Sequence, residues 1–427
     1  MSSPAHSTSD LPPLGVDDLV YWPEDDVENL EGYRPGGYHP TYINDEFSNG
    51  RYKVVHKIGY GSYSTVWLGR GQLVNRYVAL KIIVGEASTN GAELKILQHL
   101  RSDSSIHLRQ QYIASLLDVF TFRGPNGEQQ CLVSEVGGCS IALSKENSSN
   151  FMFPIDTARS IAAQVVMGLA YMHSCGVVHG DLHARNILIQ PTHMDDMTTD
   201  EIYERFGQPF EIPVVRNDKA TLGPEAPSNA IIPMNLIAPS NEVVDSKIKI
   251  TDFGTSFFVD GPPAKLHTPT SLLPPEAFFH EPIGPPADIW TLGCTLFDIL
   301  GERTIFETWA DDRDDVIAEM VSALRNLPTR WWRKWKKRPD FFLEDGKSWN
   351  PKFDRMQTPV FRPLEQRLRQ MGRGSTPETC ELDEAERASL KSLLSAMLVY
   401  EPSERITADG TMHSAFLQPW AIAVPIT

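Results

Sequence analysis

Hydrophobic and polar positions divide the chain into a β-type segment followed by a longer helical one. Between residues 51 and 137, short apolar runs rich in β-branched and aromatic residues are separated by turn residues, the pattern typical of strands. One stretch instead has leucines at three-residue spacing, which predicts a helix over 91–100. This segment is therefore predicted to be an antiparallel sheet with one helix. The runs expected to be strands are 52–58, 64–69, 77–84 and 130–135.

After residue 137 the apolar spacing becomes helical. Residues 155–174 repeat apolar side chains every three to four positions, and Asp156 and Thr157 are the expected N-caps of this helix. Residues 190–246 interrupt the pattern with seven prolines and no sustained period, so this insert is expected to be functional or partly disordered. Further helices are expected over 287–300, 315–324, 383–399 and 406–416.

Charge is distributed unevenly along the 427 residues. The net charge is −16, and ten acidic residues against one arginine place −9 of it in residues 1–50. This N-terminal extension is expected to be an extended arm, ordered locally around 33–42. The acidic balance argues against direct binding of nucleic acid, because phosphate neutralisation needs Lys and Arg, and it suits a basic peptide partner. We expect a monomer of ordinary globular composition, with 41% hydrophobic residues.

The five cysteines and the first 14 residues indicate the cellular compartment in which the protein is expected. Five cysteines are widely spaced and form no CxxC pair, so neither a disulfide framework nor a zinc site is expected. A reducing compartment, the cytoplasm or the nucleus, is the simpler interpretation. The first 14 residues have no apolar core of a secretory signal, and no run of about 18 apolar residues predicts a membrane span.

A glycine-rich turn between two expected strands is the first candidate for chemistry. Residues 58–66 read IGYGSYSTV, and the small residues let backbone amides approach phosphate oxygens. Taken alone, the segment is also compatible with an ordinary β-turn. If it binds a nucleotide, the contacting residues are Ile58, Gly59, Tyr60, Gly61, Ser62, Ser64 and Val66.

A lysine near the end of the next apolar strand is the second candidate. Lys81 could reach the α- and β-phosphates of a nucleotide, oriented by Glu93 in the helix that follows. A solvated edge lysine is the alternative, which the glycine loop upstream makes less favourable. Ala79 and the hinge residues Glu135 and Gly137 would line the remainder of the nucleotide pocket.

Two polar motifs at the ends of apolar segments complete the chemical set. Residues 179–186 read HGDLHARN, in which Asp181 would accept or orient the proton of a substrate hydroxyl and Asn186 would hold Mg²⁺. Asp252 ends an apolar strand and is a hard carboxylate that suits the same metal. A polar surface turn and a D-x-G β-turn are the respective alternatives.

Three further motifs concern architecture, and with them the chain resembles the eukaryotic protein kinase superfamily over residues 51–418. They are PPE at 274–276, DIWTLG at 288–293 and a late arginine, Arg405, which predicts an ion pair with Glu276. The resemblance implies an α+β, bilobal protein-kinase fold, with ATP and Mg²⁺ between the lobes. Its parts would be a β-rich N-lobe over 51–137, a helical C-lobe over 138–420 with the insert at 190–246, and a tail at 421–427.

Within this superfamily the chain is similar to the SR-protein kinase family, which phosphorylates serines in Arg/Ser-rich proteins. The similarity lies in GGYHP at 36–40, NGRY at 49–52, STVWL at 64–68 and the position of the insert. It implies ATP-dependent transfer to serine or threonine in basic Arg/Ser-rich protein substrates. The acidic docking groove of that family would correspond to Asp311, Asp312, Asp314 and Asp315.

The catalytic loop departs from the family pattern at three positions. His183 replaces the lysine that serine/threonine kinases place two residues after the aspartate, and Arg185 is the expected substitute cation. Gly180 replaces the arginine before the aspartate, which would otherwise bind a phosphorylated activation loop. We therefore expect activity that does not depend on phosphorylation of the activation loop.

Two other functions stay open at the level of sequence. One is a pseudokinase scaffold that binds nucleotide without turnover, which the presence of Lys81, Glu93, Asp181, Asn186 and Asp252 disfavours. The other is a small-molecule phosphotransferase of the aminoglycoside or choline type, which the HGDLH segment resembles. Such enzymes do not usually combine this segment with the architectural motifs above.

Overall fold

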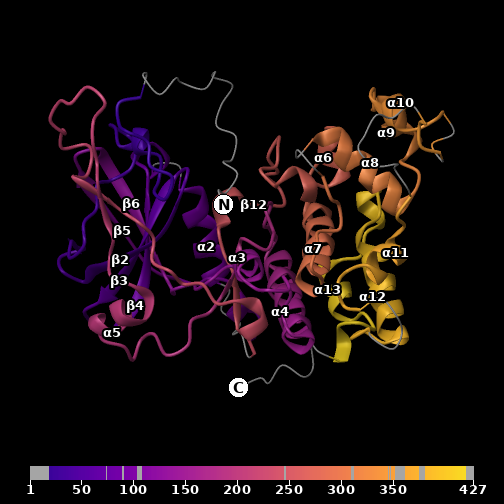
Figure 1. The fold of residues 1–427 in the computed structure, drawn as a ribbon, viewed down its shortest axis with the longest axis horizontal. Coiled ribbons are helices and arrows are strands. Elements are labelled where there is room, and N and C mark those ends of the chain that lie inside the picture. Colours follow the sequence, from indigo (N-terminus) through magenta and orange to yellow (C-terminus); the bar gives the residue numbers. More distant parts are fainter. Residues whose placement is uncertain are drawn as a thin grey trace. The chain divides into compact units, whose positions relative to one another are not determined.

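The computed structural model describes residues 19–419 except 74, 89–90, 103–107, 245–246, 309–311, 345, 347, 352–360 and 375–379. The chain forms two compact units. Of the described residues, a β-rich unit takes 19–94, 115–137 and 191–236, and a helical unit takes the others (Figure 1). The α+β fold class is confirmed.

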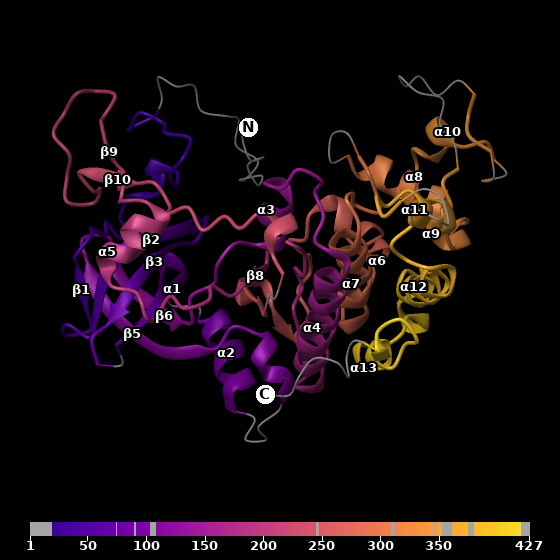
Figure 2. The same cartoon turned by 60° about the horizontal axis from the view of Figure 1, so that its bottom comes forward.

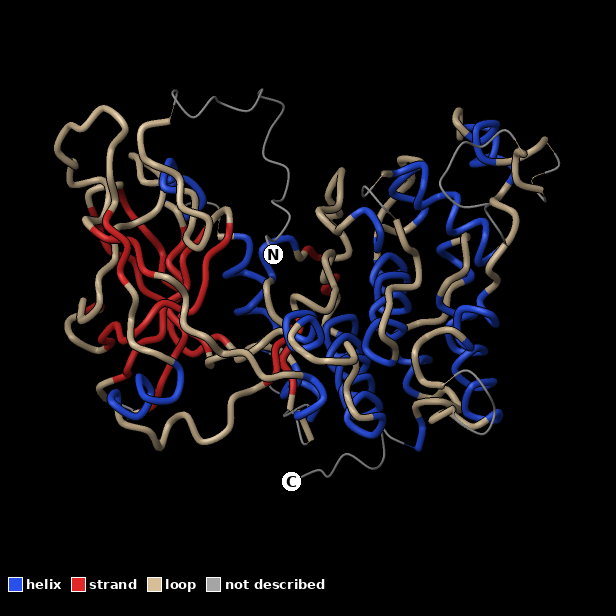
Figure 3. The backbone as a smooth tube through the Cα atoms, viewed as in Figure 1, coloured by secondary structure: helices blue, strands red, loops and turns tan. Residues whose placement is uncertain are grey.

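The β-rich unit is built on a six-stranded antiparallel sheet in the order β1-β2-β3-β4-β6-β5. Figure 3 shows the strands of this unit in red. All four predicted strands form, and β1 and β5 were not predicted. Strand β5 lies at the sheet edge with mostly half-buried side chains, so its sequence lacks a clear apolar alternation. The strands are Glu46–Phe47 (β1), Tyr52–Gly61 (β2), Ser64–Gly71 (β3), Arg76–Ile83 (β4), Leu116–Gly124 (β5) and Gly127–Ser134 (β6).

Residues 19–50 pack onto this unit, so the local order expected around 33–42 is confirmed and extends further along the segment than its composition suggested. Tyr33 and Tyr38 are buried in a cluster that also contains Val84 of the sheet end. The buried Lys57 pairs with Glu28, which also accepts a hydrogen bond from the Tyr33 hydroxyl. The pairing is favourable because an unpaired charge would be costly at this depth.

The insert contributes structure to the same β-rich unit. Helix α5 (Thr199–Phe206) begins with a capping box formed by Thr198 and Glu201. Strands β9 (Glu211–Pro213) and β10 (Asn229–Ile231) pair antiparallel. The sequence assigned 190–246 to the C-lobe, but 191–236 clusters with the sheet, where Met194, Ile202 and Met234 pack against Val55, Leu68 and Tyr77. Chain order alone cannot show which surface buries these apolar side chains.

Helix α4 (Ile155–Ser174) is the core of the helical unit. Fourteen of its 20 residues are buried, which is why apolar residues appear on nearly every face. The predicted N-caps are wrong: Pro154 is the N-cap, Asp156 pairs with Arg159, and the Thr157 hydroxyl donates to the carbonyls of 243 and 244. Helix α7 (Pro285–Leu300) packs against α4, as the two views in Figures 1 and 2 show.

The remaining elements of the helical unit are short. Helix α2 (Ala92–Ser102) leads into it, and the predicted helices at 315–324, 383–399 and 406–416 are confirmed as α8, α12 and a shorter α13. The Glu276–Arg405 ion pair is confirmed, with Nη2 2.6 Å from Oε2 and both side chains buried. No helix among the described residues is long and apolar enough to span a membrane. The other bounds are Gly85–Ser88 (α1, in the β-rich unit), Ile141–Glu146 (α3), Pro275–Phe278 (α6), Arg313–Leu324 (α8), Thr329–Lys334 (α9), Arg338–Phe341 (α10), Leu364–Arg369 (α11), Glu384–Met397 (α12) and Ala408–Met412 (α13).

Candidate active site

The glycine-rich turn joins strands β2 and β3. The pairing of Gly61 with Ser64 closes the hairpin, and residues 60–63 are exposed. A side chain added at Gly59 or Gly61 would meet no atom of the chain, so the space above the backbone amides is open. Ser64 is buried and pairs with Ile83, so the exposed part of the turn that could receive phosphates is 60–63.

Lys81 and Glu93 meet within the β-rich unit. The Lys81 Nζ lies 2.7 and 2.9 Å from the two carboxylate oxygens of Glu93. Val66 is directly opposite Lys81 in the β3–β4 register, and Ala79 lies two residues before it, so the three side chains share one face of the sheet. Ala79 in turn pairs with Ser134, the residue before Glu135. The predicted lysine–carboxylate pair is therefore confirmed.

In the helical unit, a two-stranded ladder brings the metal-binding candidates to one end. Strand β8 (Ile187–Ile189) runs antiparallel to β11 (Ile248–Ile250), so the residue before β8 lies beside those after β11. Accordingly, the Thr251 amide donates to the Asn186 carbonyl at 2.8 Å. The next residue, Asp252, is exposed and has left-handed backbone angles, φ 62° and ψ 75°, which turn the chain sharply after the strand.

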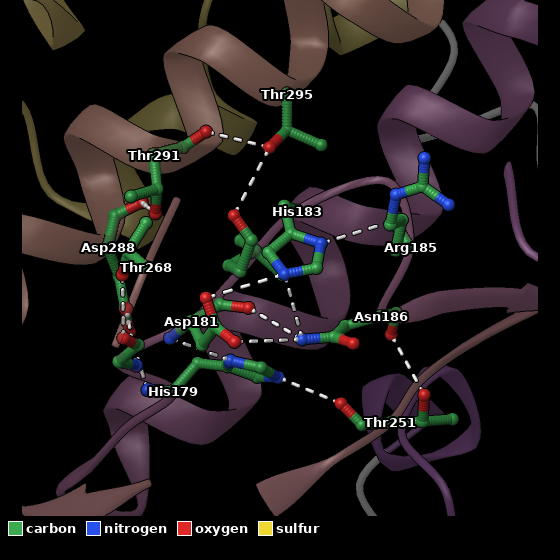
Figure 4. A network of polar contacts seen from close by, with 12 residues as sticks. His179, Asp181, His183, Arg185, Asn186, Thr251, Thr268, Asp288, Thr291 and Thr295 are labelled. Atoms are coloured by element: carbon green, nitrogen blue, oxygen red, sulfur yellow. Dashed lines mark hydrogen bonds and ion pairs between the residues drawn. The ribbon is translucent and has the colours of Figure 1, made fainter. Parts of the chain in front are cut away.

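Asp181 is held by Asn186 (Figure 4). The Asn186 Nδ2 donates to the Asp181 backbone carbonyl at 3.0 Å and to its Oδ2 at 3.3 Å. Both amide protons are thereby used, which leaves the Asn186 Oδ1 as an oxygen ligand for a metal. An amide oxygen and the exposed carboxylate of Asp252 are hard donors that fit Mg²⁺.

The backbone of the catalytic loop is fixed by a buried carboxylate on α7. Asp288 accepts the amides of His179 and Gly180 at 2.7 and 2.9 Å and also contacts the His173 ring at 2.9 Å. Burial alone would raise the pKa of Asp288, but the hydrogen bond and charge of His173, the charge of His179 and the Gly180 amide together outweigh it, so the pKa is lowered and the group stays ionised. Gly180 has φ +78°, and a side chain there would approach the Thr255 carbonyl to 2.9 Å.

The side chains of His183 and Arg185 have different partners. The His183 Nε2 is 3.4 Å from Asp181 Oδ1, and its Nδ1 accepts the Arg185 amide at 3.2 Å. The Arg185 guanidinium instead pairs with Glu146 at 2.6 Å, and both side chains are about half exposed. The structure thus places His183, and not Arg185, against the candidate catalytic carboxylate (Figure 4).

The activation segment is tied to the loop by neutral groups. The Thr268 hydroxyl donates to the Gly180 carbonyl at 2.9 Å, and the Ser256 hydroxyl donates to the His179 carbonyl at 2.9 Å. These two hydroxyls hold residues 256 and 268 against the backbone of the catalytic loop.

The expected acidic docking residues have structural partners. Asp312 caps α8 by accepting the amides of 314 and 315, and Asp314 accepts the Trp335 indole N–H at 2.7 Å. Asp315 is buried, and Asp311 lies outside the described residues. The two acids with the clearest contacts therefore serve first to fix α8 and the segment that carries Trp335.

Some contacts of this site could not be predicted from the sequence. Glu146, the partner of Arg185, lies 39 residues earlier in the chain and has no motif around it. Thr268 lies in a segment that departs from the family pattern. The position of His183 was evident from its spacing to Asp181, but not its contact with the carboxylate.

Comparisons with known proteins agree with this geometry. The family model described as protein kinase domain matches residues 52–200 and 231–417, so the gap falls within the insert. Protein kinase dsk1 of Schizosaccharomyces pombe is 27% identical over 92% of this chain and 85% of its own length. Serine/threonine-protein kinase SRPK of Physarum polycephalum is 26% identical over 91% of both chains.

A shorter match has a higher identity. SRSF protein kinase 3 of Homo sapiens is 37% identical over 41% of this chain, and the match spans 30% of the length of that protein. The family model covers most of this chain, and the proteins it is similar to are named a protein kinase, a serine/threonine-protein kinase SRPK and an SRSF protein kinase. The chain therefore belongs to the protein kinase family.

Proposed function

We propose that this kinase transfers the γ-phosphate of ATP to serine or threonine in Arg/Ser-rich proteins, with Asp181 as the residue that orients the accepting hydroxyl. The observation that carries the proposal is the Asp181–Asn186 contact, held on a loop whose backbone amides are anchored by Asp288. A loop fixed in this way presents a preorganised carboxylate, as a transfer that depends on positioning requires.

Separate groups of residues would bind the phosphates, the metal, the substrate hydroxyl and the adenine. Lys81, oriented by Glu93, would align the α- and β-phosphates, and the exposed turn at 60–63 would receive the phosphate oxygens. Asn186 Oδ1 and Asp252 would hold Mg²⁺, which neutralises charge on the phosphates when it is bound. Asp181 accepts or orients the hydroxyl proton. Glu135, Gly137 and Ala79 would contact the adenine.

The preference for basic substrates is supported by charge. The chain carries −16 overall, and two of its similar proteins are named SRPK and SRSF protein kinase. An acidic surface raises the local concentration of Arg-rich segments and favours their association. The expected partners are therefore basic proteins, and not nucleic acids or membranes.

Radiolabel transfer from Mg-ATP tests the proposal. The substrates are an Arg-Ser peptide, an acidic-site peptide, a tyrosine peptide and an aminoglycoside, each offered to wild type, Asp181→Ala and Lys81→Met. We expect transfer to the Arg-Ser peptide by wild type and a loss of about 100-fold or more in both variants. Lys95→Met is the matched control, because it removes an exposed lysine from α2, the helix that carries Glu93.

The alternatives give distinct results. Equal background in wild type, Asp181→Ala and Lys81→Met would support a scaffold without turnover. Transfer to the aminoglycoside in place of the peptides would support a small-molecule enzyme, and transfer to the tyrosine peptide would contradict the hydroxyl preference. Unchanged activity in Lys95→Met would show that the loss in Lys81→Met is specific to that position.

A further inference from the structure

The Asp181 carboxylate has two oxygens in different environments. Oδ2 receives the Asn186 amide at 3.3 Å, and 16% of the Asp181 side chain is exposed. Oδ1 is buried and has no hydrogen bond of normal geometry in the described part of the chain. Oδ2 is therefore the carboxylate oxygen that a substrate hydroxyl could reach. The inner oxygen still needs a partner, because an unpaired buried charge is costly.

The polar group that faces this inner oxygen is the His183 ring. Its Nε2 lies 3.4 Å from Oδ1, and the side chain is 9% exposed. This distance is long for a hydrogen bond, but such bonds are often long in free enzymes and shorten when substrate binds. Figure 4 shows the ring between Asp181 and the backbone of Arg185.

The surroundings decide which ring nitrogen carries the proton. Nδ1 accepts the Arg185 backbone N–H at 3.2 Å, so it has no proton, and a neutral imidazole must carry its proton on Nε2. The Asn186 Nδ2 also lies 3.3 Å from Nε2, but both of its protons are directed to Asp181 oxygens. The Nε2–H is therefore free to donate to Asp181 Oδ1.

We propose that His183 is a positioning residue, which as the Nε2–H tautomer holds the inner oxygen of Asp181 so that the outer oxygen meets the accepting hydroxyl. The inference rests on the proposed role of Asp181. The neutral Nε2–H of His183 would then hold Asp181 in place, as the charged ammonium of a lysine at this position would. Arg185, paired with Glu146, then contributes through its backbone N–H, which selects the tautomer.

Two substitutions separate the two nitrogens. His183→Gln places an N–H donor at the position of Nε2, and His183→Asn places its amide at the position of Nδ1, out of reach of Asp181. We expect His183→Gln to keep kcat within about threefold of wild type and His183→Asn to lose about 10- to 100-fold in kcat with an unchanged KM for ATP. A merely structural role would not separate the variants in this way at equal thermal stability.

Equal kcat in the two variants, or a change confined to KM, would overturn the inference while the proposed function stands. Wild-type transfer no higher than that of Asp181→Ala would overturn the proposed function and this inference with it.

A second measurement does not depend on turnover or on the folding of the asparagine variant. The chain has 12 histidines, and the ¹⁵N signals of His183 are those absent from the spectrum of His183→Gln. At pH 8 we expect a protonated Nε2 and an unprotonated Nδ1 for this ring. The opposite tautomer would refute the proposal.

Discussion

The buried pair of Arg405 and Glu276 permits the sharpest prediction about stability. Arg405 donates to both Glu276 oxygens at 2.8 and 2.6 Å and to the carbonyls of 286, 399 and 400 at 2.8, 2.8 and 3.1 Å. The guanidinium also lies 5.1 Å from the centre of the Trp290 ring. Arg405→Met would leave an unpaired carboxylate and three carbonyl acceptors in a region where both side chains are at most 1% exposed.

The magnitude follows from these contacts. Removing one partner of a buried pair costs about 3–5 kcal/mol, because the remaining charge is desolvated without compensation. Each carbonyl that loses its donor lowers the free energy of unfolding further, by about 1 kcal/mol. Since a whole domain is stable by only about 5–15 kcal/mol, Arg405→Met should unfold at a much lower urea concentration than wild type or fail to fold.

An exposed arginine provides the control. Arg330 also pairs with two carboxylates, Glu281 and Glu401, but 43% of its side chain is exposed. Exposed pairs contribute about 0–1 kcal/mol, so Arg330→Met should cost no more than that. Urea unfolding followed by tryptophan fluorescence measures both variants. Equal losses in Arg405→Met and Arg330→Met, or a loss below about 1 kcal/mol in the first, would refute the argument from burial.

Three further predictions follow from charge and burial. Burial lowers the pKa of His39 to about 4, below its ordinary 6.5. The unfolded chain therefore binds this proton first, and stability should fall by about 2 kcal/mol between pH 7 and pH 5. His39→Gln should reduce that slope, measured as the free energy of unfolding at each pH, and an unchanged slope would contradict the assignment. The KM for an Arg-Ser peptide should rise with ionic strength, because screening weakens attraction to an acidic surface, and a flat KM would exclude this attraction. Phosphatase treatment should leave activity unchanged, because Gly180 and Thr268 join the two segments without phosphate, and abolished activity would contradict this.

Local signals in the sequence predicted much of the fold and the chemical set. Short runs rich in β-branched and aromatic residues predicted four strands, and apolar side chains at helical spacing predicted the main helices. The spacings around Lys81, Asp181 and Asp252 correctly indicated a protein kinase, and the individual roles of these residues stay predictions. The pairs Lys81–Glu93 and Glu276–Arg405 were predicted correctly from motifs alone.

The tertiary structure decided what depends on contacts between distant parts of the chain. The insert packs on the sheet of the β-rich unit, and the residues before the sheet are ordered by Glu28 and Lys57. Arg185 turns to Glu146, while His183 faces Asp181. Short-range periodicity reports only which side of an element is apolar, and the free energy of burying a charge depends on the partner that folding brings to it. For that reason the sequence was enough to select the candidate residues, whereas their interaction partners were determined by the folded structure.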